Sequence, residues 1–122
     1  LAGKSMFWSC PTHRFVTSAI VGGILPIAVG VAAAIKRQGA PEQVWVFLGD
    51  MAATTGIFHE AVHYADGHDL PIRFIVEDNG LSTDSPTRAC WGKDILVPSP
   101  RVWRYTYKRV WPHVNSGVWV NF

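Results

Sequence analysis

The chain has 122 residues, of which 48% are hydrophobic and 16% are charged. This composition excludes a disordered or collagen-like chain, and the length suits a single domain spanning residues 1–122. Eleven Lys and Arg residues against nine Asp and Glu residues leave a net charge of +2, which is too small and too evenly spread to predict nucleic-acid binding.

The cysteines and the first residue bear on compartment and completeness. Cys10 and Cys90 permit at most one bridge, which is too few for a disulfide framework or a cysteine-based zinc site. Such thiols are typical of reduced proteins, so we expect a cytoplasmic location. Because the chain begins at Leu1 without an initiator Met, we expect a fragment of a longer subunit or a processed form.

An uncharged run covers residues 15–35, and its length alone would suit a membrane span. Pro26 is best tolerated in the first turn of a helix, which predicts a helix from about Leu25 to Gln38, with Gly39 just beyond its end. Such a helix spans roughly 21 Å, short of a hydrocarbon core of ~30 Å. We therefore expect a buried helix that covers a sheet, and no membrane insertion.

A strand–helix–strand unit follows. The continuous apolar run 44–48 predicts a strand buried on both faces of a parallel sheet. After a turn at Gly49-Asp50, a helix is predicted over 55–66 and a second strand over 72–76, joined by a right-handed crossover. One apolar stripe marks the helix: Ile57, Phe58, Ala61, Val62 and Ala65.

The last part of the chain changes in composition. Residues 78–100 are rich in Gly, Ser, Thr, Pro and Asp, which predicts a long loop used for function or for a partner. Beyond an α/β portion over 1–100, residues 101–122 contain two strand-like segments that predict a terminal β-hairpin. Four tryptophans favour a subunit interface over an ordinary core in this region; they are Trp91, Trp103, Trp111 and Trp119.

His59, Glu60 and His63 match the H-E-x-x-H pattern, in which two histidines on one helix face bind zinc and the glutamate acts as general base. The extended pattern requires Gly three residues after the second His and another His three residues later. Here Gly67 and His68 are out of that register. A zinc metalloprotease is therefore a disfavoured alternative to histidines that lie opposite the apolar stripe, in solvent or at an interface.

Polar groups also follow the ends of the two predicted strands, where ligands gather in an open parallel sheet. Asp50 offers a carboxylate, Asn79 an amide oxygen and Leu81 a backbone carbonyl, a set of oxygen donors that suits Mg²⁺. The backbone N–H groups of Met51 and Ala52, at a helix start, can bind a phosphate. The residues alone leave open the alternative that the Asp and the Asn only cap local structure.

These residues resemble the thiamine-diphosphate motif, which is Gly-Asp-Gly followed later by Asn-Asn. The resemblance is greatest to the alpha subunits of 2-oxo-acid dehydrogenases of the pyruvate and acetoin dehydrogenase type, and it covers roughly residues 3–88. The matching segments are Gly49-Asp50, Gly56, Glu60-Ala61, Leu70-Pro71, Glu77-x-Asn79, the loop Ile20-Val21-Gly22 with the helix behind it, and Gly3-Lys4-Ser5-Met6.

The resemblance implies an α/β, three-layer fold with a mainly parallel sheet, the thiamine diphosphate-binding fold, incomplete in this chain. It further implies that Mg²⁺ is held by the side chains of Asp50 and Asn79 and by the Leu81 carbonyl. The backbone of Met51 and Ala52 would contact the diphosphate. The remaining assignments are Ala19 and Val21, whose backbone would contact the aminopyrimidine ring, and Glu60, a supporting or interface carboxylate.

Three residues depart from the family pattern: Met51 stands for the third motif Gly, Asp78 for the first Asn, and Phe7 where the family often has His. Met51 could crowd the turn or require another backbone angle. None of the three removes an implied metal ligand. His113 is a loosely aligned candidate for the family's active-site loop histidine, with a hairpin-turn histidine as the alternative.

The implied function is the cofactor-binding part of an enzyme that decarboxylates a 2-oxo acid and passes the acyl group to lipoamide. The implied partners are a 2-oxo-acid substrate and a pyrimidine-binding domain or beta subunit, in a homo- or hetero-oligomer. Because that partner supplies the carboxylate that protonates the aminopyrimidine, we expect this chain alone to be inactive. The alternatives are a transketolase-like enzyme or decarboxylase that uses the same cofactor, and a non-catalytic assembly subunit.

Overall fold

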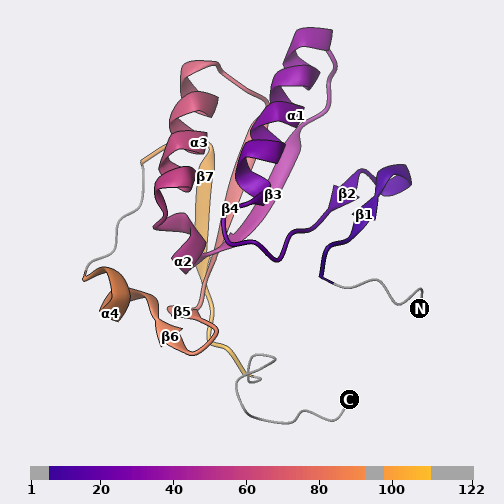
Figure 1. Cartoon of the computed structure of the whole chain (residues 1–122). Coiled ribbons are helices and arrows are strands. Elements are labelled where there is room, and N and C mark those ends of the chain that lie inside the picture. Colours follow the sequence, from indigo (N-terminus) through magenta and orange to yellow (C-terminus); the bar gives the residue numbers. More distant parts are fainter. Residues whose placement is uncertain (1–5, 93–97, 111–122) are drawn as a thin grey trace.

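The computed structural model describes residues 6–92 and 98–110 (Figure 1). Its main sheet has three strands in the order β3-β4-β7, and two small antiparallel pairs, β1-β2 and β5-β6, lie beside it. The elements in chain order are β1 (Ser9–Cys10), the 3-10 helix η1 (Pro11–His13), β2 (Phe15–Val16), α1 (Ile24–Gln38), β3 (Val44–Gly49), α2 (Asp50–Ala53), α3 (Gly56–Gly67), β4 (Ile72–Asp78), β5 (Leu81–Ser82), β6 (Ser85–Pro86), α4 (Thr87–Trp91) and β7 (Val102–Thr106).

Helix α1 has the start and stop signals that its sequence indicated. Pro26 lies in the first turn, where its missing N–H is not needed. Gly39 follows the last turn in the left-handed conformation (φ 64°) and donates its N–H to the Lys36 carbonyl over 3.1 Å. The predicted helix is thus confirmed to within one residue. No helix in the described part of the chain is both long enough and apolar enough to cross a bilayer.

The parallel strand–helix–strand unit is also confirmed. β3 pairs with β4 in parallel from Val44 opposite Ile72 to Gly49 opposite Glu77, and α3 connects the two strands. The segment after β3 differs from the prediction of a simple turn: residues from Asp50 onward form the short helix α2 before α3 begins. The polar loop predicted over 78–100 is likewise more structured, because it contains β5, β6 and α4.

Strand β7 completes the main sheet. It pairs in parallel with β4, from Phe74 opposite Val102 to Asp78 opposite Thr106. β7 covers the first of the two segments predicted to form a terminal hairpin. The second segment lies outside the described residues, so the hairpin stays a prediction. Arg101 fixes the start of β7 to α3, because its guanidinium contacts Asp66 Oδ1 over 3.0 Å and its Nε donates to the Leu70 carbonyl over 3.0 Å.

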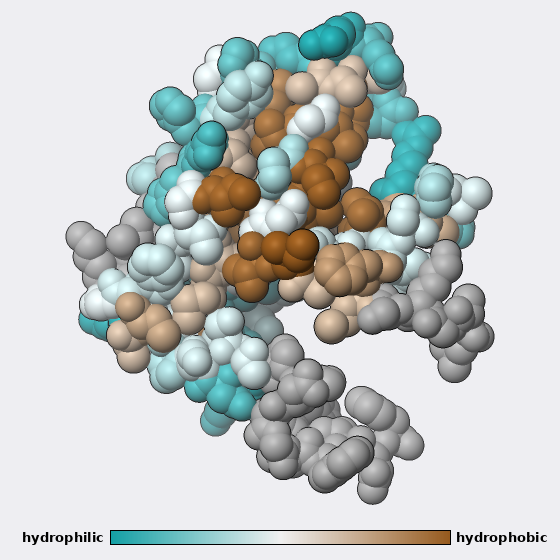
Figure 2. Space-filling model, viewed as in Figure 1, coloured by the Kyte–Doolittle hydropathy of each residue, from teal (hydrophilic) through white to brown (hydrophobic). Residues whose placement is uncertain are grey.

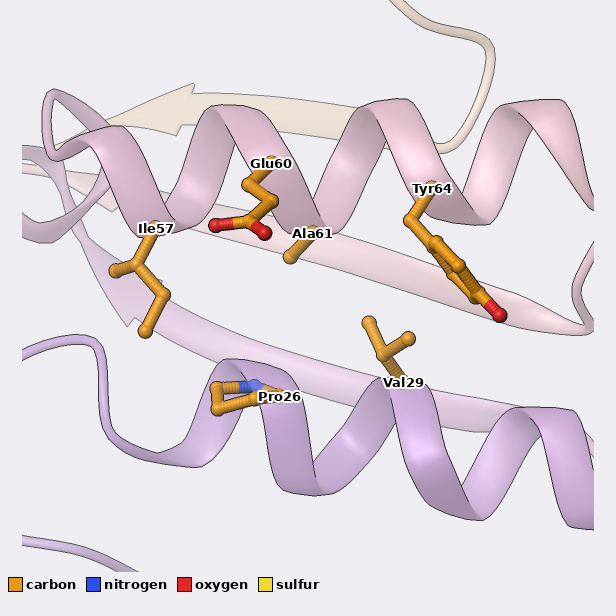
Figure 3. A pocket seen from close by; sticks show the side chains of 6 residues that line it. All are labelled: Pro26, Val29, Ile57, Glu60, Ala61 and Tyr64. Carbon is orange, nitrogen blue, oxygen red and sulfur yellow. The ribbon is translucent and has the colours of Figure 1, made fainter.

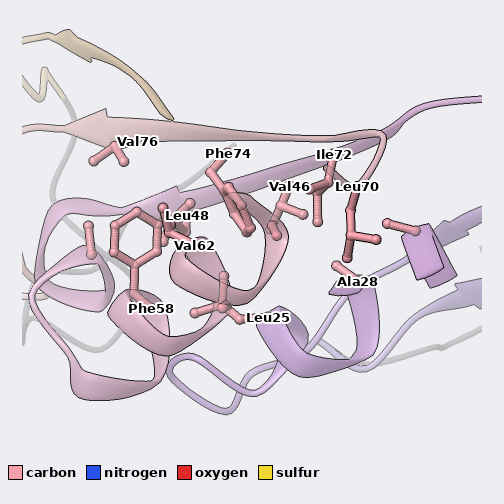
Figure 4. Packing of buried hydrophobic residues seen from close by; sticks show 14 residues of the cluster. Leu25, Ala28, Val46, Leu48, Phe58, Val62, Leu70, Ile72, Phe74 and Val76 are labelled. Atoms are coloured by element: carbon pink, nitrogen blue, oxygen red, sulfur yellow. The ribbon is translucent and has the colours of Figure 1, made fainter. Parts of the chain in front are cut away.

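The hydrophobic core lies between the sheet and the two long helices, which pack side by side on one face (Figures 1 and 4). Phe58 of α3 and Phe74 of β4 are fully buried and meet edge to face, with ring centroids 5.7 Å apart. The cluster consists of Leu25, Ala28, Ala32, Val46, Leu48, Ala53, Phe58, Ala61, Val62, Ala65, Leu70, Ile72, Phe74 and Val76. Ile57, predicted within the buried stripe, is 38% exposed.

The opposite face of the sheet is apolar but uncovered by the described residues. Trp45 and Phe47 of β3 are 49% and 61% exposed, and Trp103 of β7 is 52% exposed. The prediction that β3 is buried on both faces is therefore wrong for the part of the chain that the structure describes, because α1 and α3 lie on the same side of the sheet. The α/β fold with a mainly parallel sheet is confirmed in an incomplete form, with two of the three expected layers present among the described residues.

Gly22 is a position where the fold excludes a side chain. Its φ is +74°, and a Cβ there would lie 2.7 Å from Cγ2 of Ile57. Gly22→Ala is therefore expected to destabilise the chain by more than about 1 kcal/mol, measured by urea unfolding. Gly30→Ala in α1 is the matched control, because a Cβ there meets no described atom within 4 Å and alanine favours the helix. A Gly22→Ala variant as stable as the Gly30→Ala variant would contradict this packing.

Candidate metal and diphosphate site

Asp50 begins α2 directly after β3, and it is buried, with 5% of its surface exposed. Its Oδ2 atom accepts a hydrogen bond of 2.5 Å from Oγ1 of Thr87 in α4. Its Oδ1 atom is buried and has no hydrogen-bond partner among the described residues. An unpaired buried carboxylate oxygen is costly unless a positive group compensates it, so this atom is suited to a cation.

Asn79 directly follows the last residue of β4. Its side-chain Oδ1 accepts a hydrogen bond of 2.9 Å from the Leu81 backbone N–H, and its Nδ2 donates to the Tyr107 hydroxyl over 3.2 Å. Because the Leu81 N–H can only donate, the amide atom that faces it must be the oxygen and not the nitrogen. Since an amide oxygen has two lone pairs, Asn79 Oδ1 can accept this bond and also bind a cation.

Asp50 and Asn79 lie at the same edge of the sheet. β3 and β4 run in parallel and end opposite each other at Gly49 and Glu77, so the residues that follow both strands share the carboxyl edge. Thr87 joins them: its hydroxyl donates to Asp50, and its backbone N–H donates to the Gly80 carbonyl over 3.0 Å. The loop that carries Asn79 is thereby tied to the Asp50 carboxylate.

The diphosphate-contacting candidates, Met51 and Ala52, are half-buried in α2. Met51 has helical backbone angles. A methionine in place of the third motif glycine therefore needs no left-handed conformation. Its sulfur accepts a hydrogen bond of 2.9 Å from the indole N–H of Trp91 in α4. The side chain therefore has a partner of its own.

The aminopyrimidine candidates lie in the loop before α1. Ala19 and Val21 are exposed. Gly22 packs beside Thr55 and Ile57, which places this loop next to the start of α3. His113 falls outside the described residues.

The paired histidines of α3 have no complete set of metal ligands among the described residues. His59 is half-buried beside the Phe58 ring, and His63 is exposed. Within residues 6–92 and 98–110, no group of three or more His, Cys, Asp or Glu side chains could hold a metal ion. A zinc site at His59 and His63 therefore lacks a third such ligand in the described part of the chain.

Glu60 lines a different feature, an open groove of about 250 Å³ between α1 and α3 (Figure 3). The other lining residues are apolar or aromatic: Pro26, Val29, Ile57, Ala61 and Tyr64. Figure 2 shows that hydrophobic side chains gather over these two helices on the outer surface. This position suits an interface carboxylate better than one that acts at the carboxyl edge of the sheet.

The structure adds two partners that sequence reasoning missed, Arg104 and Tyr105 of β7. Asp78 is buried and forms an ion pair with Arg104 of β7. The neighbouring Glu77 accepts a hydrogen bond of 2.5 Å from the Tyr105 hydroxyl, which favours the protonated phenol and raises the pKa of Tyr105. The one available signal was Asp78 itself, because a carboxylate at the end of a buried strand requires a cationic partner.

Comparison with known proteins decides the family. Residues 2–93 match the family described as Dehydrogenase E1 component, a match over about three quarters of the chain. The chain belongs to the dehydrogenase E1 component family. The match includes α1, β3, α2, α3, β4 and α4 and thus the whole candidate site up to Thr87, whereas β7 lies beyond it.

The relatives of this E1-family chain are alpha subunits, which confirms the predicted resemblance. It is 32% identical over 94 residues to the pyruvate dehydrogenase E1 component subunit alpha of Rickettsia typhi, covering 76% of this chain and 29% of that protein. It is 35% identical over 81 residues to the human mitochondrial 2-oxoisovalerate dehydrogenase subunit alpha, covering 66% of this chain and 18% of that protein. The chain thus spans less than a third of the length of these relatives.

Proposed function

We propose that this chain is the thiamine diphosphate- and Mg²⁺-binding part of a 2-oxo-acid dehydrogenase E1 component, within a longer alpha-type subunit. The observation that carries the proposal is the buried Asp50 Oδ1 atom. It has no hydrogen-bond partner within residues 6–92 and 98–110, and it lies at the sheet edge shared with Asn79. The family match supports the dehydrogenase assignment.

The residues present fit the implied metal. Asp50 Oδ1, Asn79 Oδ1 and the Leu81 carbonyl would together supply an all-oxygen donor set, and Mg²⁺ would keep its other positions for phosphate oxygens and water. Thr87 orients the Asp50 carboxylate by holding Oδ2, which leaves Oδ1 for the metal. Bound thiamine diphosphate supplies the thiazolium carbon at which a 2-oxo acid is decarboxylated.

The substrate class and partners extend the same proposal. The two relatives described above take their names from pyruvate and 2-oxoisovalerate, which are both 2-oxo acids. We therefore propose a 2-oxo acid as substrate, lipoamide as acyl acceptor, and a beta subunit or pyrimidine-binding domain as partner in an oligomer. The cytoplasmic location stays a prediction, and several relatives are named mitochondrial.

The alternative thiamine enzymes make a different prediction about acyl transfer. A transketolase-like protein or a simple decarboxylase would use the same two metal-binding side chains. With a partner subunit supplied, lipoamide-dependent acyl transfer would support the dehydrogenase assignment. Ketol transfer would instead support a transketolase-like enzyme. The isolated chain is expected to decarboxylate no 2-oxo acid.

The direct test is cofactor-induced stabilisation of the 122-residue chain. We expect Mg²⁺ and thiamine diphosphate together to raise its melting temperature, because a ligand that binds only the folded state stabilises it by mass action. Thiamine without phosphates, and thiamine diphosphate with a chelator, are the matched controls and should give little shift. Absence of any shift with Mg²⁺ and cofactor would favour the non-catalytic assembly subunit.

A further inference from the structure

The loop that carries Asn79 is held by residues at the end of β7 as well as by its own turns. The Tyr107 backbone N–H donates to the Asp78 carbonyl over 2.8 Å, one residue beyond the β4–β7 ladder. The Tyr107 hydroxyl accepts a hydrogen bond of 3.2 Å from Asn79 Nδ2. The main chain and the side chain of one residue therefore contact two successive residues of the loop.

Arg104 supports the same loop through Asp78. Its Nε donates to Asp78 Oδ2 over 2.7 Å, and its Nη2 contacts the same oxygen. The other carboxylate oxygen of Asp78, Oδ1, accepts the Gly80 N–H over 2.9 Å. The buried Asp78 thus joins β7 to the backbone of the turn, and the ion pair compensates its charge.

These contacts act on the orientation of the Asn79 amide. The Leu81 N–H holds the oxygen end, and the Tyr107 hydroxyl holds the nitrogen end. With both ends held, the Asn79 amide group keeps one orientation about the Cβ–Cγ bond. The second lone pair of Oδ1 therefore points in one fixed direction. Groups that orient a metal ligand in this way typically change metal affinity by about 10–100-fold when they are removed.

We propose that Tyr107 is a positioning residue for the Mg²⁺ and diphosphate site, acting through the amide of Asn79. The inference rests on the function proposed above and adds to it, because Tyr107 lies beyond residues 2–93 that match the E1 family. The segment after the family match thereby contributes to the site by orienting a metal ligand.

The test compares Tyr107→Phe with Tyr105→Phe in the 122-residue chain. Both variants lose one phenol hydroxyl near the end of β7, but Tyr105 donates its own to Glu77 instead of contacting Asn79. Mn²⁺ serves as the probe, and its Kd is measured by electron paramagnetic resonance with thiamine diphosphate present. Tyr107→Phe is expected to weaken Mn²⁺ binding by about tenfold, and Tyr105→Phe should change it less than about twofold.

The unfolding midpoint of the metal-free chain separates positioning from a purely structural role. We expect it to be the same in both variants, because Tyr105 and Tyr107 are each 46% exposed. A lower midpoint for Tyr107→Phe with an unchanged Kd would overturn the inference. Equal Mn²⁺ affinities of Tyr107→Phe and the unchanged chain would also overturn it, while leaving the proposed function intact. Failure of the unchanged chain to bind Mn²⁺ would overturn both.

Discussion

Asp50→Asn is expected to abolish the stabilisation of the chain by Mg²⁺ and thiamine diphosphate. At a ligand concentration of a hundred times Kd, binding contributes about 2.7 kcal/mol, or a shift in melting temperature on the order of 10 °C for a chain of this size. The variant should show almost none of this shift, because the amide removes the anionic charge of an oxygen that has no partner in the described part of the chain.

The metal-free Asp50→Asn variant should melt no lower than the unchanged chain. A neutral amide costs less to bury than an uncompensated carboxylate, and its oxygen can still accept the hydrogen bond from Thr87. His63→Ala is the control, because His63 is exposed on α3 and should leave the cofactor-induced shift unchanged. The zinc alternative predicts the reverse, with metal binding lost in His63→Ala and retained in Asp50→Asn.

The second large effect concerns the core. Phe58→Ala is expected to lower the free energy of unfolding by about 3–5 kcal/mol, because the Phe58 ring is fully buried and packs edge to face on Phe74. The total free energy of unfolding of a small domain is only about 5–15 kcal/mol, so this single change removes a large part of the stability. Urea unfolding monitored by circular dichroism measures it.

Phe47→Ala provides the matched aromatic control on the other face of the sheet. Phe47 is 61% exposed, so its removal should change the free energy of unfolding by less than about 0.5 kcal/mol. If Phe47→Ala destabilised the chain as much as Phe58→Ala, the outer face of β3 would be packed in solution. The one-sided core described above would then be incorrect.

Local signals were sufficient to predict the two long helices, α1 and α3, and the order of β3 and β4, but not the short helices α2 and α4. Pro26 and Gly39 mark the ends of α1 through backbone constraints that depend only on neighbouring residues. The apolar run 44–48 identified a strand but misjudged its surroundings, because Trp45 and Phe47 are apolar and exposed. Burial on a second face depends on what else packs there, which a local pattern does not contain.

The candidate site was predictable to the level of its strand ends. Asp50 and Asn79 lie at the same edge because parallel strands end together, a consequence of topology that the sequence pattern already contained. Thr87 and Tyr107 could not be predicted, since they lie 37 and 28 residues from their partners in the chain. Such contacts depend on how α4 and β7 pack.

The most direct measurement is anomalous diffraction from crystals of the chain grown with Mn²⁺ and thiamine diphosphate. We predict a single Mn²⁺ peak at about 2.0–2.3 Å, the range of Mg²⁺–oxygen bonds with allowance for the larger ion, from Asp50 Oδ1, Asn79 Oδ1 and the Leu81 carbonyl. A metal bound between His59 and His63, or bound to Asp50 without Asn79, would contradict a cation shared by the two strand ends.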